Sequence, residues 1–251
     1  MKDQALIAYT LRLADNALVL AQRMVELVAA EPELEEELAN ANFALDYIGQ
    51  ARMFYTLAGH LEGRGRSEDD FAFMRDEHEF RNLLLLEQPN GHFGDALVRQ
   101  YLFEVFYVHQ LEALTRCSDA GLAEIAARAI KEVTYHRRHS SQWLIRLGDG
   151  TELSHDRMQA SLNDVWRYTG EMFSADAIDK AVQEDYSGPD LEEIRQIWLR
   201  EVSTTVDEAT LELPGDQWMA GGGKQGKHSE HLGFILAEMQ YLQRSFPGAT
   251  W

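Results

Sequence analysis

Apolar residues recur every three or four positions along most of the chain, and polar residues fill the positions between them. This periodicity is typical of amphipathic helices. It predicts four long helices over residues 4–29, 32–62, 95–115 and 122–147, and shorter ones over residues 154–173, 174–188, 191–211 and 229–245. Pro32 is expected to open the second helix, where its missing N–H is not needed. No segment alternates apolar and polar residues long enough to indicate a strand, so the sequence predicts an all-α fold.

The helix over residues 122–147 carries polar side chains on the face that is expected to point inward. Apolar or small residues with helical spacing mark that face: Ile125, Ala129, Val133 and Trp143. The same face carries Glu132, His136 and His139. In ferritin-like bundles, two helices each supply one glutamate and two others each supply Glu-x-x-His, which together hold a pair of metal ions. Here Glu132-x-x-Tyr135 matches the spacing of Glu-x-x-His, with tyrosine in place of the histidine. His136 is the next residue, about 100° further around the helix.

Three other long helices each offer one acid on an apolar face: Asp15, Asp46 and Glu104. With Glu132, these acids form the same pattern in two similar helix hairpins, one acid on each helix. In each hairpin, the position three residues after the second acid, where a ligand histidine is expected, holds another residue. Gly49 follows Asp46 and offers no ligand, while tyrosine at 135 is a poorer ligand for divalent iron than imidazole. The pattern therefore predicts a degenerate di-iron site in a ferritin-like four-helix bundle.

The predicted domain organisation is a single ferritin-like domain over residues 1–251, with the bundle core over residues 1–148 and additional helices over residues 149–251. Residues 67–94, rich in charged and aromatic side chains, form the longest connection. A long crossover is expected where the second and third helices of a bundle lie far apart.

Two other interpretations of the acids stay open. Each acid has an arginine within about one turn, so the four acids would be paired in salt bridges: Arg12, Arg52, Arg99 and Arg128. An arginine or lysine that fills the metal cavity would satisfy both interpretations. Alternatively, the chain is an active di-iron oxidase that uses Asp15, Asp46, Glu104, Glu132 and His136, with a π-bulge that re-aims the histidine.

Composition narrows the function classes. The chain has 251 residues, 45% of them hydrophobic, which is enough for a real core. Its formal charge of −19 argues against nucleic acid as a partner, since binding it needs cationic contacts with phosphates. The single cysteine, Cys117, excludes an intramolecular disulfide. Neither a secretory signal nor a membrane-spanning stretch is evident, so we expect a soluble, cytoplasmic protein.

A glycine-rich segment over residues 221–229, GGGKQGKHS, matches nucleotide-binding patterns through Gly221, Gly226 and Lys227. Such patterns need a strand directly before the glycines, and none is predicted there. We therefore expect a flexible, basic, exposed loop. His228 and His231 have the spacing of a metal half-site, but their place at a helix start favours capping and surface roles.

Five stretches of the chain carry a resemblance to a known family: AYTLRLADNALVLAQR, ANFALDYIGQAR, FMRDEHEFRNLLLLEQPNGHFGD, AIKEVTYHRRHSSQWLIRLGDGT and GKHSEHLGFILAEMQYLQR. Together they span nearly the whole chain. The sequence resembles the family of structural, non-catalytic subunits of bacterial phenylacetyl-CoA epoxidases. That resemblance implies a ferritin-like fold and a hetero-oligomeric complex with a homologous catalytic subunit, with a homodimer as a further possibility.

The resemblance also implies where the cofactors lie and which residues touch substrate. No cofactor is expected in this chain; the di-iron centre would be in the catalytic subunit, and FAD with an iron–sulfur cluster in an NADPH-dependent reductase subunit. The complex would epoxidise the aromatic ring of phenylacetyl-CoA with O₂. The resemblance places substrate contacts at Glu79, Phe80, Arg81, Asn82, Lys180, Ala181 and Val182. A scaffold that only stabilises its partner, without touching substrate, is the remaining alternative.

Overall fold

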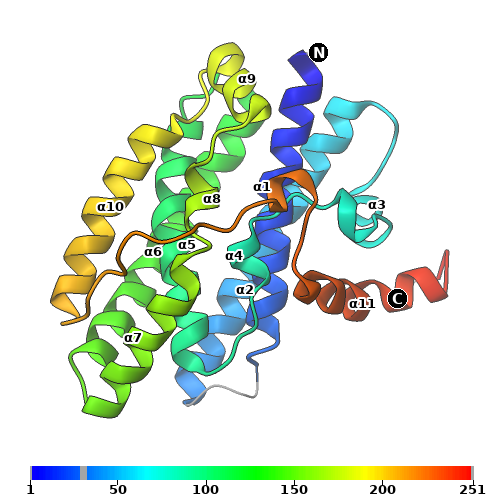
Figure 1. Ribbon diagram of the computed structural model, residues 1–251. Coiled ribbons are helices and arrows are strands. Elements are labelled where there is room, and N and C mark those ends of the chain that lie inside the picture. The colour runs from blue at the N-terminus through cyan, green and yellow to red at the C-terminus, as the bar shows by residue number, and fades with distance from the viewer. Residues whose placement is uncertain (1, 29–32, 250–251) are drawn as a thin grey trace. The chain divides into compact units, whose positions relative to one another are not determined.

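The computed structural model describes residues 2–28 and 33–249, so that Pro32 lies outside the described residues. Over these residues the chain forms eleven α-helices and two short 3₁₀ helices, with no strand, which confirms the all-α prediction (Figure 1). The chain divides into two compact units: Met1–Pro89 with Gly222–Trp251, and Asn90–Gly221. We call them the first and second units. No helix within the described ranges is long and apolar enough to span a membrane.

The first unit is built on a helix hairpin in which α1 (Lys2–Val25) packs along α2 (Leu34–Glu62). The crossover that follows α2 is more regular than expected, with α3 (Glu68–Phe73), η1 (Glu77–Glu79) and α4 (Leu84–Glu87). The end of the chain returns to this unit as η2 (Gly223–Gln225) and α11 (Glu230–Ser245). Helix α11 contacts α1, α3, η1 and α4. The last predicted helix therefore belongs with the first hairpin.

The second unit is built on the hairpin of α5 (Phe93–Leu114) and α6 (Ala120–Gly148). Four further helices complete it: α7 (Glu152–Trp166), α8 (Gly170–Phe173), α9 (Ala177–Tyr186) and α10 (Leu191–Glu208). Helix α5 packs against α6, α7 and α10 and is apolar on most sides. Trp198 on α10 fixes one of these contacts, because its fully buried indole N–H donates to the Leu102 carbonyl at 2.9 Å.

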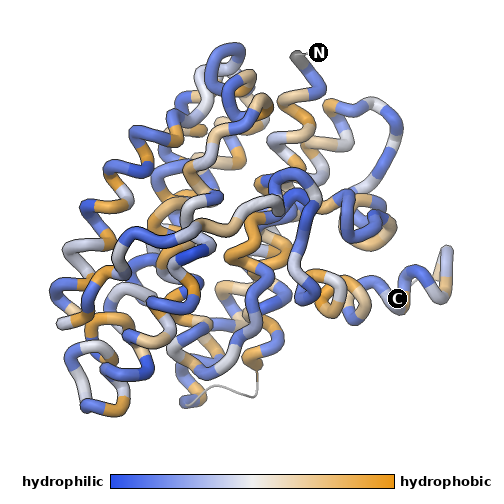
Figure 2. Tube along the Cα trace, in the orientation of Figure 1, coloured by the Kyte–Doolittle hydropathy of each residue, from blue (hydrophilic) through white to orange (hydrophobic). Residues whose placement is uncertain are grey.

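Each hairpin has the form of one half of a ferritin-like four-helix bundle. Most helices are amphipathic, and Figure 2 shows hydrophobic and hydrophilic residues alternating around them. Polar side chains cap several starts, as where Asp119 accepts from the N–H of Leu122 at the beginning of α6. The single domain over residues 1–251 stays a prediction.

Two glycines on α2 have opposite surroundings. A Cβ built at Gly49 would meet no heavy atom within 4 Å, so the helix has room for a side chain there. A Cβ built at Gly59 would lie 2.5 Å from the carbonyl oxygen of Arg66. That close approach lets the chain turn back along the helix end after Gly63, which has a left-handed φ of 68°. The glycine at 59 is therefore required by packing, whereas the one at 49 is not.

We expect Gly49→Ala to stabilise the protein by about 0.5–1 kcal/mol, because alanine loses less backbone entropy in a helix. The same change at Gly59 should destabilise it by about 1–3 kcal/mol through overpacking. Urea unfolding of both variants measures these opposite signs. Equal effects at the two positions would contradict the packing argument.

Candidate functional site

Asp15, on α1, has a fully buried carboxylate and therefore needs compensating partners. The Tyr55 hydroxyl, from α2, donates to Oδ1 at 2.6 Å. The Arg75 guanidinium donates to both oxygens, from Nη1 to Oδ2 at 3.2 Å and from Nη2 to Oδ1. The backbone N–H of Arg81 donates to Oδ2 at 2.8 Å. These bonds fill the roughly four acceptor sites of a carboxylate, which leaves none for a metal ion.

The Arg75 guanidinium also uses its other N–H groups in hydrogen bonds. Its remaining donors reach three oxygens: the Phe71 carbonyl from Nε at 2.6 Å, the Glu79 carbonyl from Nη1 at 3.1 Å and the Tyr55 hydroxyl from Nη2 at 3.0 Å. The guanidinium also lies 4.1 Å from the centre of the Phe80 ring, a geometry that favours a cation. All five N–H groups of the side chain are thus in use.

The charges follow from this geometry. Burial disfavours the charged form of Arg75, but the charges of Asp15, Tyr55 and Glu79 and the hydrogen bond to Asp15 together outweigh it and raise the pKa of Arg75 above its usual range. Burial and then the charge of Asp15 raise the pKa of Tyr55 well above its ordinary value. Tyr55 therefore stays a neutral donor, and the cation that Asp15 meets is a guanidinium. The charge of this acid is thus balanced by an arginine, the kind of partner that the salt-bridge interpretation expects.

The other acid of this hairpin, Asp46, is half-buried, and burial raises its pKa. Gly49, one turn later, leaves room for a side chain and supplies none. The arginine nearest in sequence does not serve Asp46, since Arg52 pairs with Glu68 at 3.0 Å on the surface.

In the second unit, Glu104 is fully buried on α5. Its Oε1 accepts from the Gln100 amide at 2.8 Å and its Oε2 from the Ser140 hydroxyl at 2.6 Å. Neutral donors thus occupy both oxygens. Glu132, on α6, is half-buried.

The expected inward orientation of Tyr135 is corrected by the structure. Its side chain is 61% exposed, whereas His136 is fully buried. The buried positions of α6 recur every three or four residues: Leu122, Ala126, Ala129, Val133, His136, Ser140, Leu144 and Gly148. Position 135 is therefore one residue, about 100°, away from the buried stripe. The helix is regular throughout, so no π-bulge is needed to turn His136 inward.

Burial, and next the charge of His139, lower the pKa of His136 to about 3. The imidazole is therefore neutral at ordinary pH, which is the form that binds metals. Yet among residues 2–28 and 33–249 no three or more His, Cys, Asp or Glu side chains are grouped to hold a metal ion. Within the first unit, the Asp15 carboxylate, whose acceptor sites are all taken, does not fit a metal ligand.

The residues expected to contact substrate fall in different units. In the first, the Glu79 carboxylate accepts from the Asp76 N–H at 2.8 Å and caps η1, and Phe80 is buried beneath Arg75. Asn82 is also buried, and its amide donates to the Leu83 carbonyl at 3.2 Å. These three side chains serve local structure. Arg81 is half-buried, with Nη1 held by the carbonyls of His78 and Phe80.

In the second unit, Val182 is buried and its carbonyl accepts from the Gly188 N–H at 3.1 Å, which closes the end of α9. Ala181 is half-buried, and Lys180 is exposed. Of the seven expected contacts, Arg81 and Lys180 have the exposure and charge to meet an anionic ligand. All seven stay predictions.

The glycine-rich segment is less exposed than expected, although Gly221, Gln225 and Lys227 are exposed. Gly223 and Lys224 are buried, and side chains at Gly223 and Gly226 would collide with the carbonyls of Asn82 and His78. The glycines let this backbone pack on the crossover, with no strand before them. The nucleotide-binding interpretation therefore stays excluded.

His228, which ends this segment, is a buried ion-pair partner. Its Nδ1 lies 3.1 Å from the Glu87 carboxylate and its Nε2 3.0 Å from the Phe80 carbonyl. Both partners accept only, so both ring nitrogens carry a proton. Burial by itself lowers the pKa of His228, but the hydrogen bond and charge of Glu87 outweigh it and raise that pKa. Neither this pair nor Arg75 was predicted, because their partners lie 141 and 60 residues away in sequence.

Comparison with known proteins adds to this geometry. Residues 1–251 match a family described as phenylacetic acid catabolic protein. One relative, a 1,2-phenylacetyl-CoA epoxidase subunit of Escherichia coli (strain K12), is 51% identical over 246 residues. The match covers 98% of this chain and 99% of the relative, so the similarity is not confined to a shared module.

Replacing Arg75 should lower the stability of the protein. We expect Arg75→Met to destabilise the protein by about 3–5 kcal/mol, since it leaves the Asp15 carboxylate buried without its cation. Adding Asp15→Asn should restore part of that loss. Arg52→Met, which removes an exposed pair, should change stability by no more than about 0.5 kcal/mol. Denaturant unfolding of the three variants measures these differences, and equal losses at Arg75 and Arg52 would contradict the assignment.

The His228 pair predicts a pH dependence. A folded-state pKa above the unfolded value of about 6.5 stabilises the fold at lower pH, and that stability is lost as pH rises through the folded pKa. We expect His228→Gln to cost roughly 2 kcal/mol near pH 6 and less near pH 9. Urea unfolding across this range tests it, with the exposed His78→Gln as control. A cost independent of pH would show that His228 acts by packing alone.

Proposed function

The chain belongs to the phenylacetic acid catabolic protein family, and on that premise we propose that it is a structural, non-catalytic subunit of a phenylacetyl-CoA epoxidase. The homologous catalytic subunit of the complex would hold the di-iron centre. A reductase subunit with FAD and an iron–sulfur cluster would deliver electrons from NADPH. One oxygen atom of O₂ would then be added across the aromatic ring of the CoA ester, and the other would leave as water.

The saturated Asp15 carboxylate carries this proposal. Tyr55, Arg75 and the Arg81 N–H occupy the acceptor sites that a ligand carboxylate would offer to iron. A guanidinium needs no exchangeable coordination position and does no redox chemistry, so this acid serves structure. Gly49 supports the same conclusion, because it offers no ligand where a second histidine would stand.

The surface of α2 supports a role as a subunit. Leu34, Leu38 and Leu45 are exposed by 64%, 56% and 65%. Their spacings of four and seven residues place them on one flank of the helix, as in the seams between packed helices. An exposed apolar stripe of this kind marks a protein contact. We assign this flank, which we call the leucine stripe, to the interface with the catalytic subunit.

Help in binding the CoA ester is the finer part of the proposal. Arg81 and Lys180 would pair with CoA phosphates and offset the repulsion from a chain of charge −19. Arg81 is favoured because two carbonyls hold its Nη1, which fixes the guanidinium before a ligand arrives.

An active di-iron oxidase is the second candidate, and one observation favours it. His136 is buried on the same stripe of α6 as Val133 and Ser140, one turn after the half-buried Glu132. Iron content separates the two functions, since an active site of this type holds a pair of ions.

We expect the chain expressed alone in iron-replete medium to contain almost no iron and to consume no O₂ under reduction. It should co-purify with the homologous catalytic subunit. Leu38→Glu should abolish that association, because burying an unpaired carboxylate in an apolar interface is unfavourable. Leu153→Glu, at an exposed leucine of α7, is the matched control. About two irons per chain with O₂ uptake would identify an oxidase instead.

A further inference from the structure

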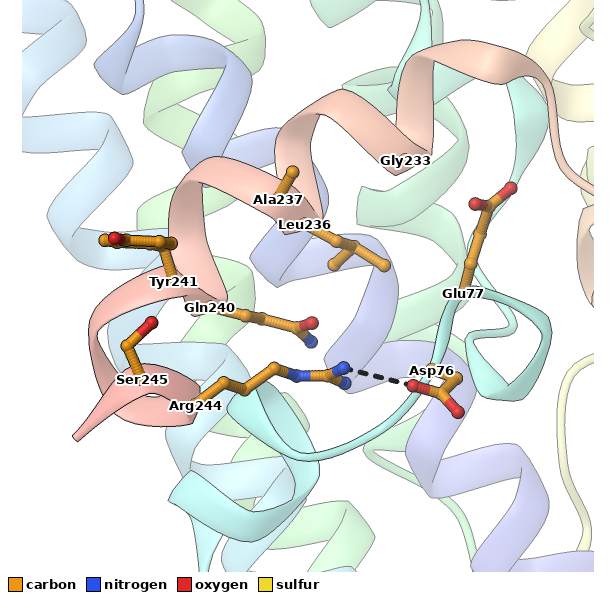
Figure 3. Close-up of a pocket in the computed structure, with 9 residues that line it drawn as sticks. All are labelled: Asp76, Glu77, Gly233, Leu236, Ala237, Gln240, Tyr241, Arg244 and Ser245. Carbon is orange, nitrogen blue, oxygen red and sulfur yellow. Dashed lines mark hydrogen bonds and ion pairs between the residues drawn. The ribbon is translucent and has the colours of Figure 1, made fainter. Parts of the chain in front are cut away.

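Helix α11 and the turn at Asp76 and Glu77 border an open pocket of about 370 Å³ in the first unit (Figure 3). Its lining combines carboxylates, one arginine, an aromatic ring and aliphatic groups: Asp76, Glu77, Gly233, Leu236, Ala237, Gln240, Tyr241, Arg244 and Ser245. Its volume is at the lower end of the roughly 300–1,000 Å³ of ligand pockets. It therefore fits a side chain better than a whole coenzyme.

The nitrogen donors around the pocket are already committed to the protein. Arg244 donates to the Phe73 carbonyl at 3.0 Å, to the Arg75 carbonyl at 2.6 Å and to Asp76 at 3.1 Å. The Gln240 amide donates to the carbonyls of Ala72 and Arg75, each at 3.0 Å. Figure 3 shows both side chains directed at the crossover. Gln240 thus uses both of its amide N–H groups and Arg244 three of its five, so most of these donors are unavailable to an anionic ligand.

A carboxylate that could bind a cation remains available in the pocket. Glu77 is exposed, and its carboxylate makes no hydrogen bond or ion pair with any residue that the structure describes. It lies close to α11 beside Gly233, where an added Cβ would come within 3.1 Å of its Oε2. The pocket thus presents a negative charge next to the aliphatic Leu236 and Ala237. A cation on an apolar stem complements both features.

The rim of the pocket indicates that this cation belongs to a protein. Phe234 and Tyr241 on α11 are exposed by 70% and 64%. Seven residues apart, they share one face of the helix, and Leu242 and Phe246 are exposed nearby in sequence. Exposed aromatic groups beside a polar pocket are typical of the anchoring regions of interfaces. A free amine would leave them uncovered.

We propose that this pocket receives a lysine or arginine side chain from another subunit of the complex, with apolar neighbours of that residue covering Phe234 and Tyr241. The inference rests on the proposed function, in that it requires the chain to work as a subunit. It adds a second contact surface, on α11, to the leucine stripe of α2. The Arg244–Asp76 pair shapes the pocket, and Glu77 recognises the cation.

A photo-cross-linker tests the occupant. In the purified complex of this chain with the catalytic and reductase subunits, Tyr241→benzoylphenylalanine should capture one peptide of another subunit. That peptide should contain lysine or arginine beside apolar residues, and Glu77→Lys should prevent its capture. A peptide from a second copy of this chain, a peptide without a basic residue, or no cross-link in an intact complex would overturn the proposal.

Measuring the affinity between subunits distinguishes a failure of this inference from a failure of the proposed function. Glu77→Lys should weaken binding of the captured subunit by about tenfold or more, since like charges would face each other across the contact. Glu124→Lys, the same charge change at an exposed position of α6, should leave it unchanged. If the unmodified chain binds none of the subunits, the proposed function fails. If it binds them and Glu77→Lys has no effect, only the pocket assignment fails.

Discussion

The buried pair of Asp15 and Arg75 is the interaction on which the first unit depends. It joins α1 to the crossover, and Tyr55 adds α2 to the same cluster. Such a pair adds little net stability over an apolar contact, but leaving either charge alone is costly. It therefore acts mainly by excluding other positions of the crossover. With Arg75 fixed, its carbonyl accepts from Gln240 and Arg244 of α11, so that the end of the chain is placed by the same residue that neutralises Asp15.

Periodicity located the acids and the helices because both depend on local spacing along one helix. It did not locate their partners. Arg75 lies in a short, irregular region 60 residues from Asp15, and no helical spacing connects the two. The arginine nearest to Asp46 in sequence has another role, since Arg52 pairs with Glu68. Tyr135 was misplaced because its position was counted from Glu132 by the Glu-x-x-His spacing, and Glu132 is itself only half-buried.

The glycine-rich segment shows a second limit of sequence reasoning. Glycines at 223 and 226 suggested flexibility, yet each allows a close contact with a carbonyl of the crossover. The surface that holds the segment is made by Phe80, Asn82 and Glu87, which are remote in sequence. Its histidine was expected at the surface because it precedes a helix. The Glu87 carboxylate, which pairs with that histidine, instead makes the position a buried ion pair.

An acid buried inside a helix hairpin needs hydrogen-bond donors or a cation, and a metal ion or a guanidinium can serve as that cation. The acid pattern therefore does not reveal whether a chain is catalytic. What separates the two is the number of acceptor sites left over, because a metal ligand must keep a site for the ion, whereas a bidentate arginine with two further donors fills a whole carboxylate. In this chain Arg75, Tyr55 and the Arg81 N–H use all the sites on Asp15. Asp15 therefore contributes to the packing of the first unit, and its carboxylate has no acceptor site left for a metal ion.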